Sequence, residues 1–202
     1  MKHPVYLVDD DEAVRRALKL LLSTVSIDVH TFADPQSFLA QLDRLVPGCL
    51  VLDIRMPLIS GLKLQEKLVE RQINWPIVVI SGHGDIEACR RAFHLGAVDF
   101  LSKPIDEMDL IDAIQKSNEV LESHLQSQAA KTEAQRQLAL MTTRENEVLN
   151  LIVKGYTTRQ IAQGLGLSPR TVESHRAAIG AKLGTTSQSE MTRLWIVAYE
   201  TP

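Results

Sequence analysis

The chain contains few cysteines, few aromatic residues and no long apolar run. Its two cysteines, Cys49 and Cys89, are too few for a disulfide framework and favour a reducing cytoplasm. No run of about 18 apolar residues occurs, so we predict no membrane span. The N-terminus lacks the apolar stretch of a signal peptide. We therefore expect a cytoplasmic protein with no membrane partner.

The chain does contain enough apolar residues for real cores, and its charge is unevenly distributed. Hydrophobic residues make up 45% of its 202 residues. Residues 1–136 carry 15 basic and 20 acidic side chains, a net charge of −5, whereas residues 137–202 carry seven and five, a net charge of +2. This asymmetry predicts two domains with different partners. By itself it does not establish nucleic-acid binding.

Strand and helix patterns alternate over the first 120 residues. Their short apolar runs predict a parallel sheet covered by helices on both faces, a doubly wound α/β fold. The predicted strands are 5–8, 29–32, 49–53, 76–80 and 98–101. Helical patterns follow each strand, among them 12–24, 62–71, 85–95 and a last one from about Asp106.

The last of these helical patterns continues without a break. Residues 121–137 are rich in Ala, Gln, Glu and Lys and contain neither Gly nor Pro. This composition predicts an extended helical linker. A disordered tether is the alternative.

Residues 141–199 have helical patterns only. Capping boxes predict helix starts at Thr142, Thr157 and Ser187, and Ser168-Pro169 predicts a fourth. Gly155 and Gly166 stand where helices should end. We expect a compact all-α domain of four short helices.

Charged and hydroxyl side chains follow four of the predicted strands. In a doubly wound sheet, ligands bind beyond the carboxyl ends of the strands. Clustered carboxylates suit Mg²⁺, a lysine suits a phosphoryl group, and a strand-end aspartate can act as a nucleophile toward phosphorus. The residues at this edge are Asp9, Asp10, Asp53, Ser81 and Lys103.

Four segments around these residues resemble the receiver domain of two-component response regulators, and most of all its FixJ-like subgroup. They are VDDD at 8–11, LDIRMPLISG at 52–61, ISGHGD at 80–85 and GAVDFLSKP at 96–104. The resemblance implies a flavodoxin-like receiver over residues 1–120. The linker would then span 121–137.

The resemblance also implies roles for single residues. Asp53 would accept a phosphoryl group from a sensor histidine kinase. Asp10 and Asp53 would hold Mg²⁺ together with the backbone carbonyl of Arg55, and Asp9 would act largely through water. Lys103 would contact the phosphate, and the bond before Pro104 would be cis.

Two further residues, Ser81 and Phe100, would form a switch pair. The Ser81 hydroxyl would move to the phosphoryl group while the Phe100 ring turns inward. Alternatively, Phe100 is an ordinary core aromatic. His83 and Arg55 flank the pocket, where they either tune the lifetime of the acyl phosphate or are ordinary loop residues.

Residues 157–183 have the pattern of a helix-turn-helix. In its second helix, Val172, Ile179 and Leu183 recur at core spacing, so the opposite face is exposed. That face holds Arg170, Glu173, Ser174, Ala177 and Ala181, with Thr171, Arg176 and Lys182 at flanks suited to phosphates. A small helical docking module is the alternative.

TTRENEVLNLIVKG and IAQGLGLSPRTVESHRAAIGAKL resemble the LuxR/NarL-type DNA-binding domain, here residues 138–202. The resemblance implies a recognition helix in the major groove of double-stranded promoter DNA, as part of a dimer. Glu173, Ser174 and Ala177 would read bases, Glu173 by accepting from a cytosine amino group and Ala177 by contact with a thymine methyl. Gly180 is unusual within a helix.

Together these features predict a phosphorylation-dependent transcription regulator. Phosphorylation of Asp53 would change the face of the fourth helix and fifth strand and favour a homodimer, with RNA polymerase a further candidate partner. One rival is a haloacid-dehalogenase-type phosphatase, which needs a second aspartate where Arg55 stands. The other is a DNA-binding protein whose receiver responds to protein contact without phosphate.

Overall fold

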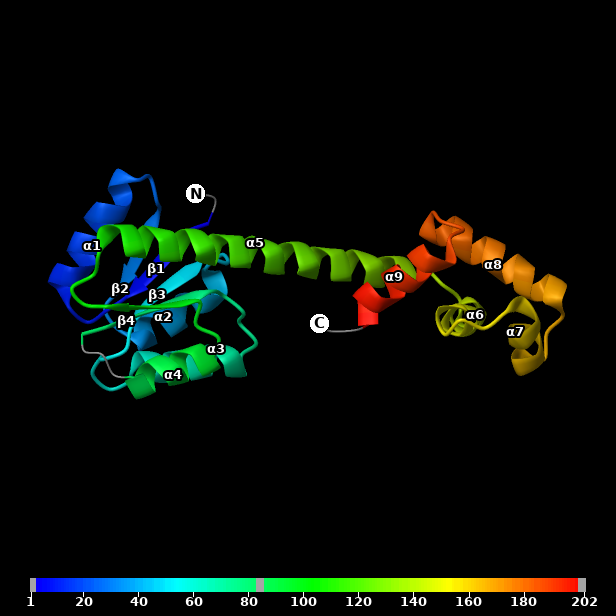
Figure 1. The fold of residues 1–202 in the computed structure, drawn as a ribbon, viewed down its shortest axis with the longest axis horizontal. Coiled ribbons are helices and arrows are strands. Elements are labelled where there is room, and N and C mark those ends of the chain that lie inside the picture. The colour runs from blue at the N-terminus through cyan, green and yellow to red at the C-terminus, as the bar shows by residue number, and fades with distance from the viewer. Residues whose placement is uncertain (1–2, 83–85, 200–202) are drawn as a thin grey trace. The chain divides into compact units, whose positions relative to one another are not determined.

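The computed structural model describes residues 3–82 and 86–199. The chain divides into two compact units, Met1–His124 and Leu125–Pro202 (Figure 1). No helix in the described part of the chain is both long and apolar enough to span a membrane.

The first unit is built on five parallel strands in the order β2-β1-β3-β4-β5. This order confirms the predicted doubly wound sheet. β4 and β5 each lie one residue later than predicted, within the usual variation of strand ends. The strands are β1 Val5–Val8, β2 Val29–Phe32, β3 Cys49–Asp53, β4 Ile77–Ser81 and β5 Asp99–Ser102.

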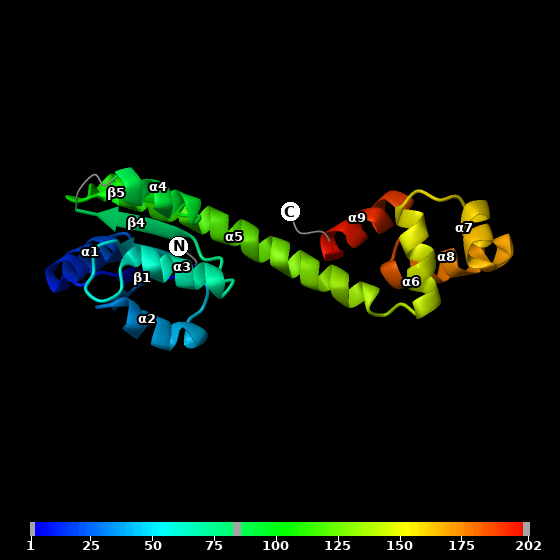
Figure 2. The same cartoon turned by 90° about the horizontal axis from the view of Figure 1, so that it is seen from below.

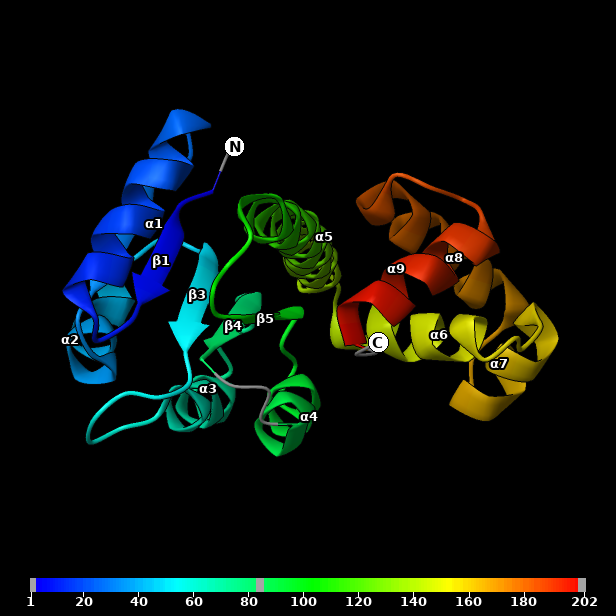
Figure 3. The ribbon, with the colours of Figure 1, turned by 60° about the vertical axis from the view of Figure 1, so that its left-hand side comes forward.

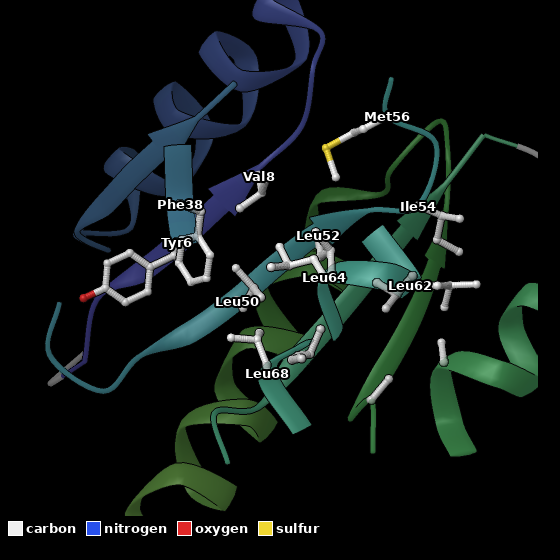
Figure 4. Close-up of a cluster of buried hydrophobic side chains, with 14 of the residues drawn as sticks. Tyr6, Val8, Phe38, Leu50, Leu52, Ile54, Met56, Leu62, Leu64 and Leu68 are labelled. Atoms are coloured by element: carbon white, nitrogen blue, oxygen red, sulfur yellow. The ribbon is translucent and has the colours of Figure 1, made fainter. Parts of the chain in front are cut away.

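Helices bury apolar side chains against both faces of this sheet. One core lies under α2, α3 and α4 and includes Phe38, Leu50 and Leu64 (Figure 4). The other lies under α1 and α5 and includes Leu22 and Ile114; Figure 3 shows α1 and α5 across the sheet from α3 and α4. The helices are α1 Glu12–Thr24, α2 Pro35–Gln41, α3 Gly61–Glu70, α4 Ile86–His94 and α5 Glu107–Leu138, with a 3₁₀ turn at Leu42–Arg44.

Helix α5 is continuous over 32 residues. The segment predicted as a linker, 121–137, is therefore helical, and the disordered tether is wrong. Its residues 126–130 are exposed. Near its C-terminal end, Ala134 and Leu138 are buried in the core of the second unit.

The second unit contains four helices after α5 among its described residues (Figure 2). The predicted capping boxes form at Thr142 and Thr157, and Ser168 caps its helix. The box predicted at Ser187 is wrong, because its N–H donates to Thr185 Oγ1 and the Glu190 carboxylate accepts from the Thr185 hydroxyl. The helices are α6 Thr143–Val153, α7 Thr158–Leu165, α8 Pro169–Leu183 and α9 Gln188–Tyr199.

Gly180, which is unusual in the middle of α8, has a packing reason. It is buried, and a Cβ atom there would lie 3.0 Å from the carbonyl oxygen of Thr185. The missing side chain lets the chain after α8 return close against the helix. This close approach explains why a glycine stands here despite its cost within a helix, about 1 kcal/mol relative to alanine.

A buried carboxylate connects α8 with the start of α6. Glu145 Oε2 accepts hydrogen bonds from Lys182 Nζ at 2.6 Å and from the Thr142 N–H at 2.7 Å. The bond from Lys182, followed by the bond from the Thr142 backbone, lowers the pKa of Glu145 from 4.5 to about 2. The ionised form is therefore favoured in the folded state.

Acidification should weaken the second unit through Glu145. A carboxyl group whose pKa is lower in the folded state stabilises above its unfolded pKa, and this stability is lost as pH falls from about 4.5 toward about 2. Glu145→Gln keeps an amide oxygen for the capping box but removes the titration, so unfolding free energy should depend less on pH in this window. Denaturant unfolding at several pH values, followed by Trp195 fluorescence in a Trp75→Phe background, measures it.

The matched control is Glu147→Gln on the same helix, where the carboxylate pairs with Arg144 at the surface. It should leave the pH dependence unchanged. The same slope in Glu145→Gln and in the parent chain would contradict the assignment.

Candidate functional site

The predicted polar residues gather at the carboxyl edge of the sheet. Asp9 and Asp10 follow β1, and Asp53 ends β3. One oxygen of each of these three carboxylates lies within 4.8 Å of the others. Ser81 ends β4 and Lys103 follows β5, so the juxtaposition expected from strand order is present.

Lys103 joins two of the acids. Its Nζ donates to Asp9 Oδ2 at 2.7 Å and lies 3.3 Å from Asp53 Oδ2. The Lys103 backbone N–H donates to the Ser81 carbonyl at 2.7 Å, which fixes the segment against β4. The bond between Lys103 and Pro104 is cis, as expected.

Burial and neighbouring charges shift the pKa values of Asp53 and Lys103. Asp9 is fully buried and Asp53 is 4% exposed. Burial raises the pKa of Asp53, the charge of Lys103 opposes this rise, and the charge of Asp9 adds to it. For Lys103, burial alone would lower the pKa, but the hydrogen bond to Asp9 and the charge of Asp53 together raise it.

The acidic cluster fits a divalent cation. The cluster has three carboxylates, and the Lys103 ammonium contacts two of them, Asp9 and Asp53, so an excess of negative charge remains. Asp53 Oδ1 is buried and has no hydrogen-bond partner within the described ranges, which is costly for a carboxylate oxygen. Oxygen-only ligands of this kind suit a hard cation such as Mg²⁺. The cluster can therefore hold a metal ion.

The remaining predicted residues surround this cluster. Asp10 and Arg55 are exposed, and Ser81 is fully buried. Phe100 is partly buried and packs at the edge of the core under α2, α3 and α4. This placement is compatible with either role predicted for Phe100. His83 lies outside the described residues.

Two residues that support the site were not predicted. Arg15 Nη1 donates to the Asp9 carbonyl at 2.7 Å and so holds the turn that carries the first two acids. Gly61 lies against the end of β3, because a Cβ there would be 2.1 Å from the Asp53 carbonyl oxygen. Gly61 lies within the LDIRMPLISG motif, which could have pointed to its role. Nothing in the sequence distinguishes Arg15 from a surface arginine.

Helix α8 presents the predicted exposed face in the second unit. Val172, Ile179 and Leu183 are buried. The residues on the opposite side are all exposed, namely Arg170, Glu173, Ser174, Ala177 and Ala181, while Thr171 and Arg176 are partly buried at its flanks. Lys182 is bonded internally to Glu145 and to the Leu140 carbonyl, so a phosphate contact would compete with this pair.

Both units match known families. Residues 5–115 match the family described as "Response regulator receiver domain". Residues 139–195 match "Bacterial regulatory proteins, luxR family".

Similar proteins align with both units of this chain over 82% or more of their own length. The transcriptional regulatory protein FixJ of Azorhizobium caulinodans is 38% identical over 202 residues, covering 98% of this chain and 94% of that protein. TdiR of Thauera aromatica is 40% identical over 190 residues, covering 93% and 82%. Among solved structures, the response regulator StyR has a TM-score of 0.81 at 38% identity, covering 96% and 98%, and full-length FixJ from B. japonicum has 0.61 at 35%, covering all of both chains.

Gly61→Ala should destabilise the first unit. The added methyl group would overlap the Asp53 carbonyl, and such overpacking costs about 1–3 kcal/mol of unfolding free energy. Denaturant unfolding followed by Trp75 fluorescence, in a Trp195→Phe background, measures the change. Gly82→Ala is the control, because no atom of the described residues lies within 4 Å of its Cβ position; equal midpoints for the two variants would contradict the predicted contact.

Proposed function

Because the chain belongs to the response regulators that join a receiver to a LuxR-type DNA-binding domain, we propose that phosphorylation of Asp53 controls its binding to promoter DNA. The family consists of transcription regulators, which excludes the phosphatase considered above. A receiver implies a sensor kinase as partner, and the second domain implies DNA.

The observation that carries the proposal is the setting of Asp53. One of its oxygens, Oδ2, faces the Lys103 ammonium at 3.3 Å, while the other, Oδ1, is buried without a hydrogen-bond partner in residues 3–82 and 86–199. An ionised oxygen held in this way is available as a nucleophile. Its bond to phosphorus would form as the phosphorus–nitrogen bond of the kinase's phosphohistidine breaks, and the released imidazole nitrogen keeps the electron pair.

Neighbouring residues would stabilise the transferred group. The Lys103 ammonium lies where it can pair with a phosphoryl oxygen, and the Ser81 hydroxyl can donate to another. Asp9, Asp10, Asp53 and the Arg55 carbonyl would hold Mg²⁺. When bound, this ion neutralises negative charge on the phosphoryl oxygens.

The signal would then reach DNA through dimerisation. Movement of Ser81 toward the phosphoryl group and of Phe100 inward would alter the face formed by α4 and β5, favouring a homodimer. Two α8 helices would then meet two half-sites of a promoter. RNA polymerase is a further partner in this proposal.

Asp53→Asn should abolish phosphorylation. The amide lacks the nucleophilic carboxylate oxygen, so incubation with Mg²⁺ and a small phosphodonor should give no mass increase of one phosphoryl group in intact-protein mass spectrometry. Asp43→Asn, an exposed aspartate on the 3₁₀ turn, should be labelled like the parent chain. Full labelling of Asp53→Asn would disprove the acceptor assignment.

The same incubation, applied to the parent chain, tests the rival in which the receiver works without phosphate. Dimerisation and DNA affinity of the parent chain would be measured with and without the phosphodonor. A parent chain that is labelled but gains neither dimer nor affinity would favour the rival.

Ala177→Glu should abolish specific DNA binding and leave phosphorylation of Asp53 intact. A carboxylate in the middle of the exposed α8 face would replace contact with a thymine methyl by repulsion from the DNA. We expect affinity for the preferred duplex to fall by about 10³-fold, the lower end of the usual gap between specific and non-specific binding. Ala129→Glu in exposed α5 is the control, and loss of labelling together with binding would contradict separable domains.

A further inference from the structure

Thr158, at the first position of α7, contacts the exposed face of α8. Its Oγ1 donates a hydrogen bond of 2.6 Å to Glu173 Oε1. Thr158 is itself held in place, because it directly follows the Thr157 capping box at the start of α7. The bond joins the two helices of the helix-turn-helix at their outer surface, outside the shared core of Ile161 and Val172.

The hydrogen bond from Thr158 uses only one of the two oxygens of the Glu173 carboxylate. Its second oxygen, Oε2, has no hydrogen-bond partner in the described part of the chain, and Glu173 is exposed. Arg170 and Arg176 lie three residues away on either side along the helix, where ion pairs commonly form. Neither pairs with Glu173 in the described structure. The carboxylate is therefore fixed by a neutral hydroxyl, and both arginines remain available for phosphates.

A carboxylate on the exposed face of α8 is unfavourable for DNA binding unless it makes a specific contact. Glu173 is the only acidic residue in α8, and a carboxylate near DNA repels the phosphates. It lowers affinity for all sequences unless it accepts a hydrogen bond from a base, and the donors exposed in the major groove are the amino groups of cytosine and adenine. Such a residue adds discrimination between bases more than affinity.

We propose that Thr158 is a positioning residue that aims Glu173 Oε2 at a base amino group and so sets specificity at one base pair; this inference rests on the proposed binding of α8 to DNA. A free glutamate side chain loses rotamer freedom when it is fixed at an interface. The Thr158 bond fixes the side chain before DNA arrives. Thr158 thus contributes to base selection without touching DNA through its hydroxyl.

The experiment uses the full chain and a library of randomised duplexes, followed by affinities for the preferred duplex and its single-base variants at one salt concentration. Thr158→Val removes the hydroxyl donor and keeps the β-branched shape. We expect it to reduce discrimination at one base pair by on the order of tenfold, with the other positions and the thermal midpoint unchanged. Thr158→Ser, which keeps the hydroxyl donor, should retain the discrimination of the parent chain at that base pair.

Glu173→Gln separates the proposed base contact of Glu173 from the proposed positioning role of Thr158. It should change preference at the same base pair, and adding Thr158→Val to it should change that preference little further, because both act through one interaction. The control is Thr132→Val, because among the described residues the Thr132 hydroxyl donates only to the Gln128 carbonyl within its own helix.

Three outcomes overturn parts of the proposal. If Glu173→Gln shifts the preference and Thr158→Val does not, the positioning role of Thr158 is wrong and the proposed DNA contact stands. If Glu173→Gln changes no base preference, the proposed contact of Glu173 is wrong, and the role of Thr158 with it. A uniform loss of affinity at all positions in Thr158→Val would indicate a structural role only.

Discussion

The polar site of the receiver depends on the Lys103 ammonium, which lies among clustered carboxylates at the sheet edge. Lys103 bonds to Asp9 and faces Asp53, and without it two nearly buried acids would stand against each other at the sheet edge. The pair is nonetheless incomplete, since one Asp53 oxygen lacks a partner in the described residues. Breaking or under-satisfying a buried ion pair is costly. The cluster therefore favours the arrival of positive charge and of groups that carry hydrogen-bond donors.

This placement requires the parallel sheet. Asp9 and Lys103 are 94 residues apart, yet both lie just past the carboxyl ends of strands. A one-residue slip of a strand would turn its end residue to the other face. Both faces of β1 and β3 are covered by apolar side chains, so a slip that drew Asp9 or Asp53 inward would bury a carboxylate away from Lys103. The same apolar packing that stabilises the first unit thus positions its polar site.

Patterns in the sequence predicted much of this structure, whereas the choice of partner by single side chains escaped prediction, even between residues close in sequence. Strand-end acids and the caps at Thr142 and Thr157 depend on neighbouring residues, and a pattern is enough to find them. The helix start predicted at Ser187 is correct, since α9 begins at Gln188, but the reciprocal bond of its capping box is missing because Thr185, just outside the pattern, donates to Glu190 instead. Arg15 reaches the Asp9 carbonyl through a side-chain geometry that spacing does not determine.

The second unit has two electrostatic requirements that oppose each other if α8 faces DNA: arginines for the phosphates and a carboxylate for a base. In the proposed complex, arginines on α8 would attract phosphates of any sequence, while an acid among them would reduce that attraction and be useful only where a base can donate to it. Such an acid loses its value if it folds back onto a neighbouring arginine, because it then cancels a phosphate contact and reads nothing. A hydroxyl on the adjacent helix prevents this without adding charge. If α8 binds DNA as proposed, the hydrogen bond between Thr158 and Glu173 would therefore let affinity and base selection reside on the same short helix.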